Sequence, residues 1–130
     1  MPYTKARIAT RMPDGTYASI FYAGSQSVSD VGETLLEYYP AAEHAKALVA
    51  GGDLKRLGPS RDDSVSLTAR VTGPKRYPSR QALVDAAVHD MWSAWIYLRG
   101  HTEWRFRHAL WPHMRPLADY LAEQAAKRGK

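Results

Sequence analysis

Basic side chains at strand spacing are the first residues of this chain whose types and positions suit a binding chemistry. Lys5, Arg7 and Arg11 lie in a segment that reads as a strand, and alternate residues of a strand share one face. Further along, Arg105 and Arg107 repeat the same spacing. Cations gathered in this way attract anionic ligands. The sequence leaves two interpretations open, a basic binding stripe or an ordinary solvated sheet face.

A second candidate site is the polar segment from Tyr22 to Asp30. It follows an expected strand and leads into an expected helix, and the amides at a helix start favour phosphate or carboxylate groups. Tyr22, Ser25, Gln26 and Ser27 are its candidate contacts. The alternative is a connection in which Ser27 or Ser29 caps its own helix.

Four aromatic residues near the C-terminal end also recur at strand spacing. The spacing places them on one face of an expected strand pair, with Arg105 and Arg107 on the other face. Aromatics interleaved with arginines resemble a base-stacking platform, but aromatics at strand spacing are more often a core face under helices. The four are Trp95, Tyr97, Trp104 and Phe106.

Catalytic and metal-binding signatures are missing from the sequence. There is no cysteine, no Gly-x-Ser-x-Gly elbow and no phosphate-binding loop motif. Asp85 and His89 are four residues apart on an expected helix, so their side chains can meet. They are either a catalytic base with its orienting carboxylate or a surface ion pair. His108 and His113 flank residues 109–112, Ala-Leu-Trp-Pro, which interrupt regular secondary structure, and the two histidines make a weak candidate for a metal site. The motifs of the sequence therefore predict no enzyme, no cofactor and no metal.

The composition is that of one globular domain spanning residues 1–130, with a frayed tail at about residues 128–130. Apolar residues make up 45% of the 130 residues, and the formal charge is +5. No apolar run is long enough to span a membrane, and the first residues lack the apolar core of a secretory signal, so we expect a cytoplasmic protein. The 4 Trp and 8 Tyr would suffice for a homodimer face as well as a core.

Periodicity and turn residues predict an α+β fold with the order ββ-αα-β-α-ββ-α. We expect an antiparallel sheet of two hairpins plus one strand, with helices packed mainly on one face. The segments 53–63 and 73–78 are expected to be turn-rich connections. The expected strands are 3–12, 17–23, 64–72, 93–99 and 103–108, and the expected helices are 29–39, 41–50, 79–90 and 114–127.

The stretch from Asp14 to Gly58 resembles a family of small uncharacterised bacteriophage and prophage proteins. Members read DGT, then a strand ending IYCHWDGYP, then VGxTLLxxY and LGDxxxLG. The chain departs from the pattern at residues 22–28, where Tyr-Ala-Gly-Ser-Gln-Ser-Val replaces Cys-His-Trp-Asp-Gly-Tyr-Pro. The residues that match are Asp14, Gly15, Ile20, Val31, Gly32, Thr34, Leu35, Leu36, Tyr39, Gly52, Asp53, Leu54, Leu57 and Gly58.

This resemblance implies a phage accessory protein in the bacterial host cytoplasm that acts by binding and not by catalysis. Its expected partner is a host protein or a small anionic ligand, in a role that counters host defence or redirects host machinery. The alternative is a nucleic-acid-binding protein that uses the basic sheet face.

Overall fold

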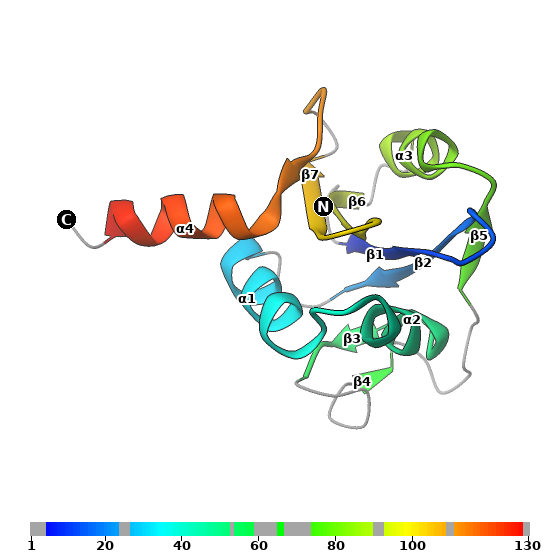
Figure 1. Cartoon of the computed structure of the whole chain (residues 1–130), viewed down its shortest axis with the longest axis horizontal. Helices are drawn as coiled ribbons and strands as arrows, with labels where there is room; N and C mark the ends of the chain where they lie inside the picture. The colour runs from blue at the N-terminus through cyan, green and yellow to red at the C-terminus, as the bar shows by residue number, and fades with distance from the viewer. Residues whose placement is uncertain are drawn as a thin grey trace.

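The computed structural model shows a single mixed sheet with helices on both of its faces (Figure 1). The strand order is β4-β3-β2-β1-β6-β7-β8, and β5 also pairs with β2. The strands are β1 (Lys5–Arg11), β2 (Tyr17–Tyr22), β3 (Leu54–Arg56), β4 (Val65–Ser66), β5 (Lys75–Tyr77), β6 (Ser93–Arg99), β7 (Trp104–His108) and β8 (Arg115–Pro116). The structure describes residues 5–23, 27–52, 54–58, 65–66, 74–89, 93–108 and 111–128.

Both predicted hairpins are confirmed. Strand β1 pairs antiparallel with β2, and β6 pairs antiparallel with β7. The turn between β1 and β2 uses Gly15 at a φ of 87°, a conformation that glycine adopts without a Cβ clash. The Asp14 carboxylate accepts hydrogen bonds from the amide and hydroxyl of Thr16 at 2.9 and 2.6 Å, and these bonds lower the pKa of Asp14.

The centre of the sheet differs from the antiparallel arrangement that we predicted. Strand β1 lies beside β6 in a parallel pair, and β2 lies parallel to β3. A parallel pair needs a long crossover connection. Here the chain between the two hairpins supplies that connection, so the hairpins join through their first strands.

Three short strands were not predicted. Segments 53–63 and 73–78 were expected to be connections, yet β3 extends the sheet beside β2, and β5 pairs with the other half of β2. Arg115 and Pro116 form β8, so the last helix begins later than predicted. Within the predicted strand 64–72, only Val65 and Ser66 belong to the described residues, where they form β4.

The helices divide between the two faces of the sheet. Figure 1 shows α1 and α2 below the sheet, α3 above it, and α4 running out to one side. Side chains of α1, α2 and α4 share the larger core cluster, whereas Leu83 of α3 packs with Ala9 and Leu98 on the opposite face. The expectation of helices mainly on one face therefore holds except for α3. The helices are α1 (Val28–Tyr38), α2 (Ala42–Ala50), α3 (Arg80–His89) and α4 (Leu117–Arg128).

The four strand-spaced aromatics belong to the core face and not to a stacking platform. Tyr97, Trp104 and Phe106 are buried, and Trp95 packs against them at the edge of the larger cluster. The Trp104 indole donates a 2.7 Å hydrogen bond to the Tyr39 carbonyl, which ties β7 to the end of α1. No helix in the described part of the chain is long and apolar enough to cross a membrane.

Candidate anion-binding groove

Strand pairing brings the basic residues of β1 and β7 to the same face of the sheet. Arg7 pairs with Ile96 across β1 and β6, and Ile96 pairs with Arg107 across β6 and β7. In the same way Leu98 lies between Ala9 of β1 and Arg105. The two hairpins thus contribute to one basic face, because the parallel pairing of β1 with β6 places them side by side. The side chain of Lys5 lies outside the described residues.

Arg7 is a buried packing residue. Its side chain is only 5% exposed, and its guanidinium donates a 2.9 Å hydrogen bond to the Tyr77 hydroxyl. The guanidinium carbon also lies 4.6 Å from the centre of the Phe21 ring. These contacts hold β5 against β2, and they leave Arg7 out of the accessible part of the basic face.

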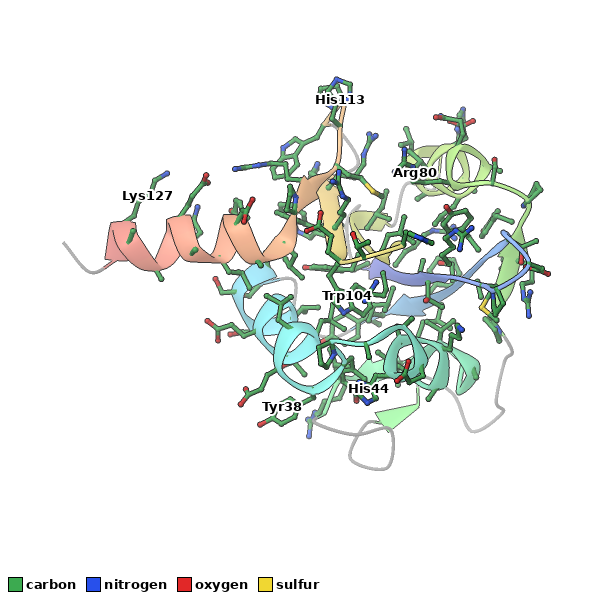
Figure 2. The ribbon with its side chains drawn as sticks, viewed as in Figure 1. Tyr38, His44, Arg80, Trp104, His113 and Lys127 are labelled. Atoms are coloured by element: carbon green, nitrogen blue, oxygen red, sulfur yellow. The ribbon has the colours of Figure 1, made fainter. Side chains whose placement is uncertain are left out.

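Helix α3 covers part of this face and forms one wall of a groove. The Ser79 hydroxyl accepts a 3.1 Å hydrogen bond from the Ala82 amide and caps the helix, as predicted. Leu83 and Ala87 are fully buried beneath it, so the helix is held on the sheet by its apolar side. Arg80, the first residue of α3, is exposed beside the groove (Figure 2).

The groove consists of two neighbouring hollows between α3 and the β6–β7 hairpin. They are about 440 and 300 Å³ in volume, and they share Arg80 and Arg105. Two residues of the second hollow are labelled in Figure 2, Arg80 on α3 and His113 on the segment before β8. The first is lined by Arg11, Tyr17, Arg80, Leu98, Gly100, His101, Thr102, Glu103 and Arg105, and the second by Arg80, Gln81, Val84, Arg105, Arg107, Pro112, His113 and Met114.

The charge of the groove is strongly positive. Four arginines line it, and Glu103 is the one carboxylate among its described lining residues. Glu103 pairs with Arg105 at 3.1 Å, and both side chains are more than 40% exposed, so water screens this pair. Among the described residues no carboxylate pairs with Arg11 or Arg80. The groove can therefore receive an anion on guanidinium groups that are still accessible.

The neighbour of Arg107 on β7 faces away from the groove. His108 meets the Trp95 ring edge-on at 4.8 Å on the other side of the sheet. Burial, and to a lesser degree Arg107, lower the pKa of His108. This imidazole therefore stays neutral at physiological pH and adds no charge to the site.

The predicted site at the start of α1 has a structural explanation in its described part. Ser27 caps the helix, because its hydroxyl accepts a 3.3 Å hydrogen bond from the Asp30 amide. Tyr22 is only 4% exposed and belongs to the larger core cluster. Ser25 and Gln26 lie outside the described residues.

The candidate acid–base pair on α3 does not form through its side chains. The Asp85 carboxylate accepts a 2.7 Å hydrogen bond from Gln81, and His89 contacts the Asp85 backbone carbonyl instead. No cluster of three metal-ligating side chains occurs within the described residues.

Sequence reasoning missed Arg80 and the part that α3 plays in the groove. Arg80 follows a capping serine, so the sequence identified it only as the beginning of a helix. Its closeness to Arg105 depends on how α3 crosses the sheet, and no local pattern reports this crossing.

Comparison of the chain with protein-family models, with curated proteins and with solved structures gives no match.

Proposed function

We propose that this protein acts by binding, and that it captures a small anionic ligand or an acidic surface of a host protein in the groove between α3 and β7. The observation that carries the proposal is the gathering of Arg11, Arg80, Arg105 and Arg107 around two neighbouring hollows. Guanidinium groups form paired hydrogen bonds with carboxylates and phosphates, which suits such partners.

The biological setting of the proposal comes from the sequence resemblance alone. A phage accessory protein in the host cytoplasm would use this binding to counter host defence or to redirect host machinery. The charge and shape of the groove support binding, and its described residues include no nucleophile–base pair that would support catalysis. The proposal therefore assigns no catalytic residue.

Nucleic-acid binding is the second candidate function. The observation that favours it is the open run of arginines along β7, where Arg105 and Arg107 lie side by side with Arg80 opposite. A backbone of phosphates could follow such a run.

The test is a titration of the purified protein with inorganic tripolyphosphate and, separately, with a hexaglutamate peptide. We expect binding of at least one probe, and Arg80→Glu should weaken it roughly tenfold, or ~1.4 kcal/mol. Lys127→Glu is the matched control, because it reverses the same charge on an exposed residue of α4, far from the groove (Figure 2).

A pair of neutralised carboxylates sharpens the test. Glu103→Gln removes the groove carboxylate, so it should tighten binding by roughly two- to fivefold. Glu123→Gln is its control, because Glu123 pairs with Arg115 at 2.8 Å outside the groove. Absence of binding to both probes, or equal binding by Arg80→Glu and the parent chain, would overturn the proposal.

A further inference from the structure

We propose that the ligand of the groove is a phosphodiester chain, a stretch of single-stranded nucleic acid whose successive phosphates occupy the two hollows. The inference rests on the proposed anion-binding groove and develops the second candidate function, nucleic-acid binding, by naming the kind of nucleic acid. The feature behind it is the spacing of the arginines, which are spread along the groove instead of converging on one point.

The sheet itself sets this spacing. Arg105 and Arg107 are two residues apart on β7, which separates their backbones by roughly 7 Å. Arg11 lies two strands away from β7, a distance of about 10 Å across the sheet. A single phosphate is best held by guanidiniums that surround one position. Arginines that arise from separate positions on the sheet and on α3 suit a ligand that presents several anionic groups at intervals.

Two residues are common to the two hollows, so we infer that one ligand can occupy both. Arg80 and Arg105 line both of them, one from α3 and the other from β7. A phosphate in either hollow therefore lies near both of these cations. Arg11 then belongs to the first hollow alone, and Arg107 to the second hollow alone.

Apolar side chains also line both hollows, and we expect sugars and bases to rest against those that are exposed. Tyr17 and Leu98 belong to the first hollow, and Val84 and Met114 to the second. The Tyr17 ring is half-buried and forms part of the wall, so it can stack against a base, as aromatic rings do in single-strand-binding proteins. Arginines alternating with such surfaces match a backbone that carries bases.

The geometry argues against two simpler ligands. A compact polyphosphate brings its charges together and would leave either Arg11 or Arg107 unused. A duplex presents a broad convex surface, whereas Arg11, Arg105 and Arg107 lie on the strands of the face that α3 partly covers. Single-stranded nucleic acid fits the narrow path, and it is supplied either as free short oligonucleotides or as a longer strand.

The experiment is a fluorescence anisotropy titration with oligothymidylates of one to six phosphates and with a thirty-nucleotide strand. We expect affinity to rise at least tenfold from one phosphate to three and then to level off. With three phosphates bound, the slope of log affinity against log salt should be about −2. Similar affinity per site for the thirty-nucleotide strand would identify long strands as a source, and markedly weaker binding would restrict the ligand to short oligonucleotides.

Variants locate the two ends of the path. Arg107→Ala should weaken the three-phosphate probe at least threefold and reduce the salt slope by about 0.7, while leaving the one-phosphate probe nearly unchanged. Arg80→Glu should weaken every probe, and Lys127→Glu should weaken none by more than twofold. Circular dichroism of each variant checks that the fold is retained.

The outcomes separate this inference from the proposed function. If tripolyphosphate binds in an Arg80-dependent way but oligothymidylate affinity does not rise with length, the phosphodiester inference is wrong and anion binding stands. If no anionic probe binds at all, the proposed function itself fails.

Discussion

Arg7, Arg105 and Arg107 point to the same face of the sheet, but their surroundings give them different tasks. Arg7 is covered by Tyr77 and Phe21, whereas Arg105 keeps 43% of its side chain exposed in the groove. The difference comes from the side chains of Tyr77 on β5 and Phe21 on β2, whose rings lie against the Arg7 guanidinium. A basic residue on this sheet is therefore structural or ligand-facing according to what lies above it.

The contacts of Arg7 predict a role in stability. Arg7→Met keeps the length of the side chain but loses the hydrogen bond to Tyr77 and the ring contact with Phe21. We expect the free energy of unfolding to fall by about 2 kcal/mol, measured by urea denaturation. Arg7→Lys should recover only part of this loss, because an ammonium cannot stack and donate as a planar guanidinium does.

Lys127→Met is the matched control for Arg7→Met, since Lys127 is exposed on α4. It should leave the free energy of unfolding within about 0.5 kcal/mol of the parent chain. An Arg7→Met variant as stable as the parent would mean that the cost of burying the charge cancels its contacts.

At the scale of elements, the close contact between α1 and α4 depends on one glycine. A Cβ at Gly32 would lie 3.0 Å from the Cδ1 atoms of both Leu117 and Leu121. Leu117 is fully buried and Leu121 nearly so, and both anchor the first part of α4 to the rest of the molecule. Gly32 thus lowers the intrinsic stability of α1 but makes room for α4.

This contact predicts that larger side chains at Gly32 displace α4. Gly32→Val should lower the free energy of unfolding by about 1–3 kcal/mol, because the overpacked leucines cannot all keep their rotamers. Thermal unfolding and urea denaturation measure the change. Glu37→Val is the control, since it places the same residue type on an exposed position of α1.

A second variant keeps the Gly32 prediction falsifiable. Shortening Leu117 to Ala in the Gly32→Val background should cost less than Leu117→Ala costs in the parent chain, because the two changes compensate in volume. If the losses in free energy of unfolding of the two single variants simply add in the double variant, Gly32 does not limit how closely α4 approaches α1.

At the scale of the whole molecule, the sheet joins the two ends of the chain. Strand β1, from the N-terminal end, lies between β2 and β6, and β6 belongs to the C-terminal half. The larger core cluster likewise combines residues of β1, α1 and α2 with residues of β6, β7 and α4. Neither half can bury its share of the core without the other.

We therefore expect the chain to unfold as one cooperative unit. Urea denaturation followed by far-ultraviolet circular dichroism, which reports on all helices, should coincide with denaturation followed by tryptophan fluorescence. Trp95, Trp104 and Trp111 all lie near the β6–β7 hairpin, so fluorescence follows the C-terminal half. Two separated transitions would show that the halves fold independently.

Local elements of this fold could be predicted from the sequence with good bounds. Ser27 and Ser79 mark the starts of α1 and α3 because a capping hydroxyl acts on amides only three residues away. The glycine turn at Gly15 similarly sets the first hairpin. Each of these signals depends on neighbours in the chain, so a single sequence carries it completely.

The strands β3 and β5 could not be predicted in the same way. Both are short and polar, and they are extended because β2 offers them hydrogen bonds. The parallel pairing of β1 with β6 is also non-local, since it depends on burying both strands beneath the same helices. These pairings decide the order of the sheet, and sequence periodicity contains no record of them.

The candidate site shows the same division. The alternation of charged and apolar residues by itself determined that Arg105 and Arg107 share a face opposite Trp104 and Phe106, because side chains of a strand point alternately to its two sides. Only the tertiary structure decided that α3 would cross this face, that Arg80 would meet Arg105 there, and that Arg7 would be covered by Tyr77. A face follows from the geometry of one strand, whereas a groove requires two elements distant in sequence to pack together.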